Sequence, residues 1–330
     1  MHELSRRRLL TLLGLPVTGA LAGCVGRGWD SPGEAVLTIA TGNPGGVFVR
    51  YGRALTTVIG RDLDGVRART RTTNASLENL RLVADGTCDV GFSLGDAAAD
   101  AVRAPADAVR AGASTAGATT PDLVALTRMY DSFVHLVVPA SSPYHRVSDL
   151  AGARIGVGAQ GSGTRVIATR VLDVHDVRAP GATFVDAALE ASAGALRAGR
   201  LDAFFFVSGL PNQAIAGLAR DTPVRLLDLG DVVEPMVAAY GPQYVRAPIP
   251  PSAYGLSEAV STLSVKNYLV ANPGLDERLA YALTRLLFER QDEIERLEPG
   301  VGQPTLGAAI FTAPLELHAG ALRYYRERGS

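Results

Sequence analysis

The sequence predicts an α/β fold with two lobes, each built from alternating strands and helices. Three observations predict it. Apolar runs of strand length alternate with helix-length segments, the two halves of the chain share this pattern, and two β-rich runs bracket the second half. Such alternation is typical of mostly parallel sheets with helices on both faces. With 330 residues, the chain could form two ordinary domains or one large one. Its composition, 47% hydrophobic with a net charge of −1, allows a sizeable core and does not indicate a nucleic-acid surface.

The first lobe is predicted to begin with a buried strand that runs into a glycine-rich turn. Further along, apolar residues alternate with Arg67, Arg69 and Arg71, which indicates a half-exposed strand whose arginines face solvent. In order, we expect a strand at 35–40, the turn at 41–46, a helix at 47–59, a strand at 66–73, a helix at 77–84, a strand at 89–92, a small-residue loop at 93–96, and a helix end and surface loop at 104–120.

The second lobe repeats this organisation. Residues 80–92 and 195–205 are similar, because each holds a helix that stops at glycine and then an Asp that opens an apolar strand. In order, we expect a helical turn at 148–152, a strand at 153–157, a helix at 165–174, a strand at 183–185, a helix at 187–198 and a strand at 203–207.

Two β-rich runs, 135–138 and 262–265, are predicted to cross between the lobes, with hinges at their ends. A charged amphipathic helix is predicted at 273–296, and the tail that follows it is expected to dock on lobe 1. The predicted lobes are therefore residues 35–135 plus 265–330 for lobe 1, and residues 140–260 for lobe 2.

Residues 1–23 are predicted to form a lipoprotein signal peptide. Three arginines precede a short apolar run, and the small residues before Cys24 resemble a lipobox. We expect cleavage before Cys24, lipid on its thiol, and a tether at 24–34 that leaves the domain outside the cytoplasm and anchored to the membrane. Arg6 and Arg7 also match a twin-arginine export signal, and an uncleaved anchor helix is the alternative.

The cysteines and histidines give no metal-ligand spacing, so neither a metal nor a cofactor is expected. Cys88 has no disulfide partner once Cys24 is acylated, and we expect a small buried residue. His135 lies in an apolar run and is expected in the core or at a hinge rather than as a general base. No serine lies in a Gly-x-Ser-x-Gly elbow, so an enzyme is not indicated, and a hydrolase with Ser162 as nucleophile is the alternative.

Two loops are candidate ligand-binding segments. Gly161-Ser162-Gly163-Thr164 lies between a strand and a helix, where free N–H groups and the positive helix end attract an anion. An ordinary N-cap is the alternative for this loop. Residues 41–46 have the same geometry in the other lobe and lack the pattern of a phosphate loop or a dinucleotide fingerprint. Because ligands bind beyond the carboxyl ends of parallel strands, we expect both loops to face one cleft.

Together, several segments resemble the TAXI-family solute-binding receptors of TRAP (tripartite ATP-independent periplasmic) transporters. The resemblance covers nearly the whole chain after residue 24. Its segments are Thr41-Gly42 with Gly45-Gly46-Val47-Phe48, residues 73–80, residues 89–96, residues 161–164, residues 202–205 with Ser208-Gly209 and Pro211, and the tail at 317–321 with Arg323-Tyr324-Tyr325 and Glu327.

This resemblance implies a type II periplasmic-binding-protein fold, with two α/β lobes joined by a β hinge and a ligand cleft between them. It also implies a receptor that captures a small carboxylate, either a glutamate-like amino acid or a 2-oxo or dicarboxylic acid, and delivers it to a TRAP permease. We expect the receptor to be a monomer. A same-fold receptor for a sensor kinase or an ATP-driven importer is the alternative. The expected ligand-binding residues are Gly45, Gly46, Val47, Phe48, Asn74, Ser76, Leu94, Asp96, Gly161, Ser162, Gly163, Thr164, Ser208 and Gly209.

The chain departs from this family at Phe48-Val49, where the family usually has Tyr-Tyr or Tyr-Phe, and at Leu94, where it often has Gln. These departures remove a hydroxyl and an amide that could contact a ligand. Ala319 replaces the proline of the family's tail, a change that is expected to be structural only.

Overall fold

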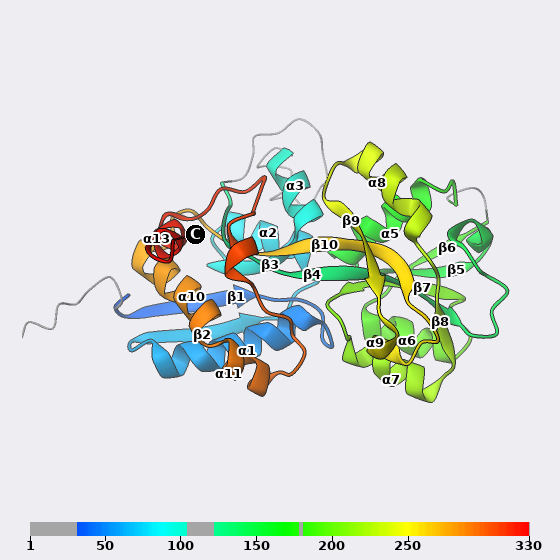
Figure 1. The fold of residues 1–330 in the computed structure, drawn as a ribbon, viewed down its shortest axis with the longest axis horizontal. Coiled ribbons are helices and arrows are strands. Elements are labelled where there is room, and N and C mark those ends of the chain that lie inside the picture. Colours follow the sequence, from blue (N-terminus) through cyan, green and yellow to red (C-terminus); the bar gives the residue numbers. More distant parts are fainter. Residues whose placement is uncertain (1–31, 104–121, 178–180, 330) are drawn as a thin grey trace, which may run out of the picture.

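The computed structural model describes residues 32–103, 122–177 and 181–329, which form two α/β halves lying side by side (Figure 1). The predicted signal peptide, Cys24, most of the tether and the predicted loop at 104–120 lie outside the described residues. Within these described ranges, no helix is long and apolar enough to cross a membrane. The same ranges hold no group of three His, Cys, Asp or Glu side chains that could bind a metal ion.

The first half alternates strands and helices as predicted. Its elements are β1 (Ala35–Ala40), α1 (Val47–Asp62), β2 (Val66–Arg71), α2 (Ser76–Ala84), β3 (Val90–Leu94) and α3 (Gly95–Arg103). β1 pairs in parallel with both β2 and β3. On β2, the side chains of Arg67, Arg69 and Arg71 are exposed, as the alternation predicts.

The predicted loop at 93–96 is wrong. Ser93 and Leu94 extend β3, because they pair with the antiparallel strand β10 (Val260–Ala271), and α3 begins directly at Gly95. The sequence-based prediction ended the strand early because it did not include this partner.

The second half has the same alternation, and β5 pairs in parallel with β6 and β7. Its elements are η1 (Val147–Leu150), β5 (Arg154–Gly158), α5 (Gly163–Asp173), β6 (Thr183–Asp186), α6 (Leu189–Arg197), β7 (Ala203–Ser208), α7 (Gln213–Asp221), β8 (Val224–Leu226), η2 (Gly230–Val232), α8 (Val233–Tyr240), β9 (Tyr244–Ile249) and α9 (Pro251–Tyr254). The elements after β7 were not predicted.

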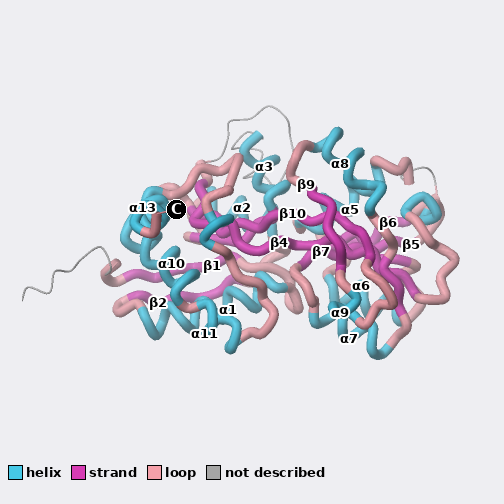
Figure 2. Tube along the Cα trace, viewed as in Figure 1, coloured by secondary structure: helices cyan, strands magenta, loops and turns pink. Residues whose placement is uncertain are grey.

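Two long antiparallel strands, β4 (Val124–Pro139) and β10, join the halves and contain the two predicted crossings. β10 pairs first with β9 and then, from Asn267 onward, with β3 of the other half. β4 in turn pairs with β7 at Phe133–Val137. The strands therefore form one sheet, in the order β2-β1-β3-β10-β4-β7-β5-β6, with helices packed around it (Figure 2). The lobe limits at 135, 140, 260 and 265 stay predictions.

The C-terminal helices pack on the first half, as predicted for the tail. Tyr325 donates its hydroxyl proton to the carbonyl of Leu126 over 3.0 Å. The prediction of a single helix at 273–296 is wrong, because the side chain of Asp276 caps a helix that starts at Glu277 and the backbone leaves helical geometry at Arg290. The helices here are α10 (Glu277–Glu289), α11 (Gln291–Leu297), α12 (Leu306–Ala309) and α13 (Ala319–Glu327).

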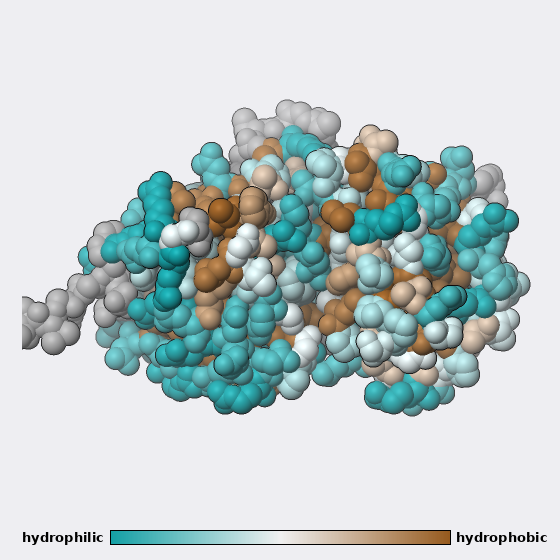
Figure 3. All heavy atoms as spheres, in the orientation of Figure 1, coloured by the Kyte–Doolittle hydropathy of each residue, from teal (hydrophilic) through white to brown (hydrophobic). Residues whose placement is uncertain are grey.

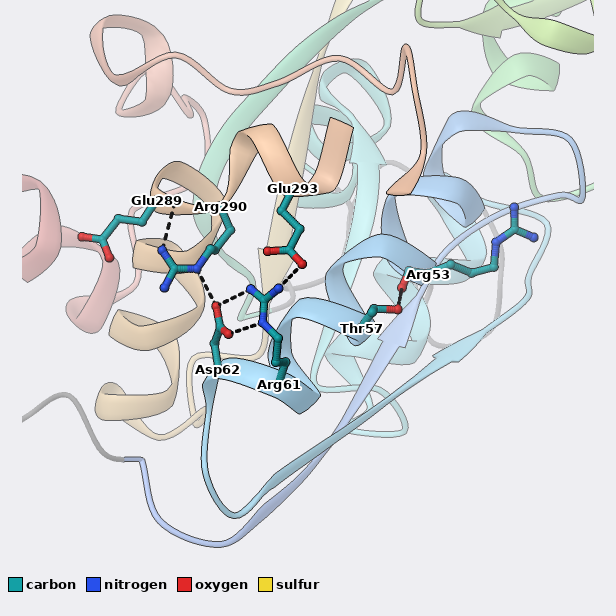
Figure 4. A network of polar contacts seen from close by, with 7 residues as sticks. All are labelled: Arg53, Thr57, Arg61, Asp62, Glu289, Arg290 and Glu293. Atoms are coloured by element: carbon teal, nitrogen blue, oxygen red, sulfur yellow. Dashed lines mark hydrogen bonds and ion pairs between the residues drawn. The ribbon is translucent and has the colours of Figure 1, made fainter. Parts of the chain in front are cut away.

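An ionic network fastens α11 to the end of α1 (Figure 4). Arg61 donates to Asp62 over 2.6 Å and also pairs with Glu293, and Arg290 donates to Asp62 as well. The hydrogen bond from Arg61, followed by that from Arg290, lowers the pKa of the Asp62 carboxyl to about 2. Hydrophilic side chains cover this outer layer over α1 and α11 (Figure 3), so the network lies at a solvated surface.

Candidate functional site

A pocket lies where the loops of the two halves meet. Nine of its lining residues were predicted from the sequence: Gly46, Val47, Phe48, Ser76, Leu94, Ser162, Gly163, Thr164 and Ser208. Seven others were not among the predicted site residues, although the first two belong to the candidate loop at 41–46: Gly42, Asn43, Ala75, Tyr130, Ser132, Phe206 and Val207. The structure thus brings the two candidate loops, far apart in sequence, to one pocket.

Five residues of the predicted site do not line this pocket: Gly45, Asn74, Asp96, Gly161 and Gly209. Two of them mark places where the halves approach each other closely. A Cβ added to Gly45 would lie 2.2 Å from Oε1 of Glu190 on α6, and one added to Gly161 would lie 4.0 Å from Cβ of Asn74. Gly45 and Gly161 both have positive φ angles of about 79° and 78°, which favour glycine.

Three helices begin at the pocket. α1 starts at Val47, α2 at Ser76 and α5 at Gly163, and all three residues line it. The first N–H groups of any helix have no intrahelical acceptor, and the N-caps of α1 and α2 offer no side-chain acceptor in its place. Each helix N-terminus also carries a partial positive charge. Three such ends around one pocket favour an anionic ligand.

Three hydroxyl groups at the pocket keep their protons available. The oxygen of Ser76 accepts from the N–H of Leu94 over 3.1 Å, and that of Thr164 accepts from the N–H of Val207 over 3.2 Å. The oxygen of Ser162 accepts from the N–H of Arg165 over 3.1 Å, so Ser162 is the N-cap of α5, which was the alternative considered for this loop.

Within the described ranges, none of these three hydroxyls donates to a protein acceptor. A hydroxyl group has one proton and two lone pairs, so an oxygen that already accepts can still donate. All three side chains are buried. Their protons are therefore free for a ligand that accepts hydrogen bonds.

The rest of the pocket wall is neutral and largely apolar. Among the described residues that line it, none is Asp, Glu, Lys, Arg or His. Phe48 stacks on Phe92 with ring centroids 5.3 Å apart, which holds one face of the Phe48 ring against the core of the first half. Tyr130 lies on the crossing strand β4, and its buried hydroxyl has no partner within the described part of the chain. Sequence reasoning missed Tyr130 because a long buried strand does not reveal which of its residues face a cleft.

Asp96 makes a separate contact between the halves. Its Oδ2 accepts from the Tyr244 hydroxyl over 2.9 Å and from Arg170 over 3.4 Å, while its Oδ1 has no partner among the described residues. Arg170 also pairs with Asp100 on α3 and lies 4.6 Å from the ring centroid of Tyr240. Burial raises the pKa of the Asp96 carboxyl to about 6, although the Arg170 charge opposes the shift. This cluster links α3 of the first half to α5, α8 and β9 of the second.

His135 and Cys88 are core residues, as predicted. The imidazole of His135 contacts the Tyr254 hydroxyl at 2.9 Å and the Phe206 carbonyl at 3.3 Å. Its burial lowers its pKa to about 4, so the ring is neutral at pH 7. The Cys88 thiol is buried and free, and burial raises its pKa.

The sequence profile of the NMT1-like family matches residues 39–329, which include both halves and the whole pocket lining. The chain belongs to the NMT1-like family. Membership therefore extends over the loops at α1, α2 and α5 as well as the C-terminal helices.

A solved structure shares the fold of this NMT1-like chain, and two others are reported with it as similar. A protein from Bordetella bronchiseptica RB50 is 16% identical, with 90% of this chain and 99% of that chain covered and a TM-score of 0.55. The periplasmic aliphatic sulphonate binding protein SsuA from Escherichia coli is 14% identical, with 88% and 78% covered and a TM-score of 0.44. An ancestral arginine-binding protein bound to arginine is 14% identical, with 80% and 98% covered and a TM-score of 0.47. The predicted fold class, two α/β lobes joined by β-strands, is confirmed.

Proposed function

We propose that this protein is an extracytoplasmic solute-binding receptor that holds a small carboxylate between its two lobes. The observation that carries the proposal is the meeting of three helix N-termini, those of α1, α2 and α5, at one pocket without charged side chains in its described lining. An anion there receives hydrogen bonds from backbone N–H groups and from hydroxyls, and it needs no counter-ion from a side chain.

The geometry also supports a binding cycle in which the lobes close on the ligand. Gly163 belongs to the second half, and a Cβ on it would lie 2.5 Å from Cδ1 of Leu94 and 2.8 Å from Oγ of Ser76, both in the first half. A ligand held by both Ser76 and Thr164 therefore ties the lobes together. Each charge-assisted hydrogen bond contributes roughly 1.5–3 kcal/mol, so two or three of them favour the closed state.

The proposal has two more specific parts. Cys24 carries the lipid anchor, and a TRAP permease receives the carboxylate. A receptor of the same fold for a sensor kinase or an ATP-driven importer would use the same pocket. SsuA is named as a periplasmic protein, and an extracytoplasmic location of the present protein agrees with that name. A permease gene beside this one favours transport, and a kinase gene favours sensing.

Binding rather than catalysis is the role that the Ser162 contacts support. Its oxygen accepts from the N–H of Arg165, and the imidazole of His135 contacts Tyr254 and Phe206 instead. A nucleophilic serine needs a base within hydrogen-bond reach. Turnover assays on generic esters and amides test the hydrolase alternative, and we expect no turnover.

Native mass spectrometry of the purified protein tests the proposal directly. We expect a co-purified acid of low mass, whose return to the stripped protein shrinks the radius of gyration in small-angle scattering. If neither the stripped protein nor the protein as purified binds any small carboxylate in calorimetry, the proposal is refuted.

A further inference from the structure

We infer that the ligand is an acid with one negative charge, an apolar body and no ammonium group. This inference rests on the proposed carboxylate-binding function and narrows its ligand class. Amino acids and dicarboxylic acids are then poor ligands, whereas monocarboxylates with an alkyl or 2-oxo substituent are good ones.

The first step is the absence of an acidic side chain from the described pocket lining. An amino acid bound there would bury its ammonium group without a carboxylate to pair with it, and an unpaired buried charge is costly. The nearby acids do not supply one. Asp96 is 1% exposed and bound to Arg170 and Tyr244, and Glu190 is an exposed residue that contacts Gly45 outside the lining.

The second step is the direction of the polar groups. Ser76, Ser162 and Thr164 each accept a hydrogen bond from a backbone N–H and each keep a proton to donate. The free N–H groups at the starts of α1 and α2 are donors too. These groups can donate to carboxylate and carbonyl oxygens. An ammonium group has only protons to offer, and the described lining holds no carboxylate to accept them.

The third step is the amount of charge. A helix N-terminus carries a partial charge of about +0.5, so three of them supply about +1.5 in total. That is enough for one carboxylate and too little for two. A second carboxylate in this pocket would find no basic side chain in the described lining to pair with it.

Two matched pairs of probes test the inference in calorimetry with the full mature protein. The first pair is 4-methyl-2-oxopentanoate and L-leucine, which share a carbon skeleton and differ in the ammonium group. The second pair is 2-oxoglutarate and L-glutamate, which add a second carboxylate. We expect 4-methyl-2-oxopentanoate to bind at least about 100-fold more tightly than leucine, because burying an unpaired charge costs several kcal/mol. We expect the dicarboxylates to bind more weakly than 4-methyl-2-oxopentanoate as well.

A pair of variants tests the cause. Leu94→Glu places a carboxylate in the pocket and should shift the ratio of the two affinities toward leucine by at least about tenfold. Leu94→Met is the matched control, because it keeps the volume and adds no charge, so it should preserve the ratio of the wild-type protein. Circular dichroism checks that both variants fold.

The outcomes separate this inference from the function on which it rests. Tighter binding of leucine or glutamate than of the 2-oxo acids overturns the inference and leaves a carboxylate receptor. If Leu94→Glu and Leu94→Met shift the ratio of the two affinities equally, the argument from charge is overturned. If no member of either pair, and no monocarboxylate of two to eight carbons or its sulfonate isostere, binds the wild-type protein, both the carboxylate function and the inference fail. Preference for the sulfonate isosteres keeps the monoanion and overturns the carboxylate.

Discussion

Gly163→Ala should weaken ligand binding without destabilising the fold. Gly163 is the first residue of α5, and its φ lies in the ordinary range, so alanine fits the backbone there. Its added Cβ, however, would lie 2.5 Å from Cδ1 of Leu94 across the pocket. Carbon atoms normally contact at about 3.5–4.0 Å, so the lobes or the leucine must separate by about 1 Å.

Overpacking of this kind costs about 1–3 kcal/mol, and here the cost falls on the closed state alone. Affinity for the tightest-binding acid should therefore fall by about 5- to 150-fold in calorimetry. Stability of the ligand-free protein in urea should hold or rise. Gly194→Ala is the control: this glycine lies within α6 and a Cβ there meets nothing within 4 Å, so the substitution should add about 0.5–1 kcal/mol of stability and leave affinity unchanged.

The double variant Gly163→Ala with Leu94→Ala separates the steric cause from others. Removing the leucine atoms that the new methyl group meets should restore part of the closure, so the two substitutions should be non-additive. The reasoning is refuted if Gly163→Ala binds as tightly as the wild type, or if the loss is the same with and without Leu94.

Three further perturbations address stability and location. The pKa of the Asp96 carboxyl is raised to about 6, against about 3.9 in unfolded chains, so between these pH values the folded protein binds a proton that the unfolded chain has lost. The free energy of unfolding should therefore fall by about 2–3 kcal/mol as the pH rises from about 4 to 6. Urea unfolding should show this pH dependence in the wild type and not in Asp96→Asn. The pKa of the Asp62 carboxyl is lowered to about 2, so its contribution to stability is present at pH 7 and is lost as the pH falls toward 2. Asp62→Asn should therefore lower the free energy of unfolding by about 1 kcal/mol at pH 7, a figure reduced because Arg61 is half exposed, and should have no effect near pH 2. If the variant and the wild type are equally stable at both pH values, the network does not stabilise the fold. Cys24→Ala should remove the lipid and leave the precursor uncleaved in intact-mass measurements, whereas an unchanged mature mass without lipid contradicts the anchor.

The strands and helices with a strong local pattern could be predicted from the sequence. β1 and β7 are short apolar runs bounded by polar or glycine residues, and the start of α5 is fixed by Ser162, whose side chain caps the helix. What the sequence could not predict depends on distant partners. Leu94 is part of a strand because β10 lies beside it, and β9 is a strand because it pairs with the other end of β10.

The candidate site could be predicted only as far as its loops. The two helices were identifiable because small and hydroxyl residues precede apolar periodicity, but they begin at Ser76 and Gly163, slightly before the predicted starts at 77 and 165. Tyr130 and Phe206 could not be identified, because each lies within a buried strand whose twist decides which side chains face the pocket. Asp96 was expected at the ligand, and its carboxylate instead binds Arg170 from the other half, a partner 74 residues away in the sequence.

The continuous sheet has a consequence for how this protein folds and breaks down. Because β10 completes the hydrogen-bond ladders of β9 at one end and of β3 at the other, neither half has a finished sheet of its own. A fragment that holds one half would expose the unpaired edge of a long central strand, which is a template for aggregation. The molecule should therefore melt in one cooperative step. Mutations in one half should lower the unfolding temperature of the other by the same amount.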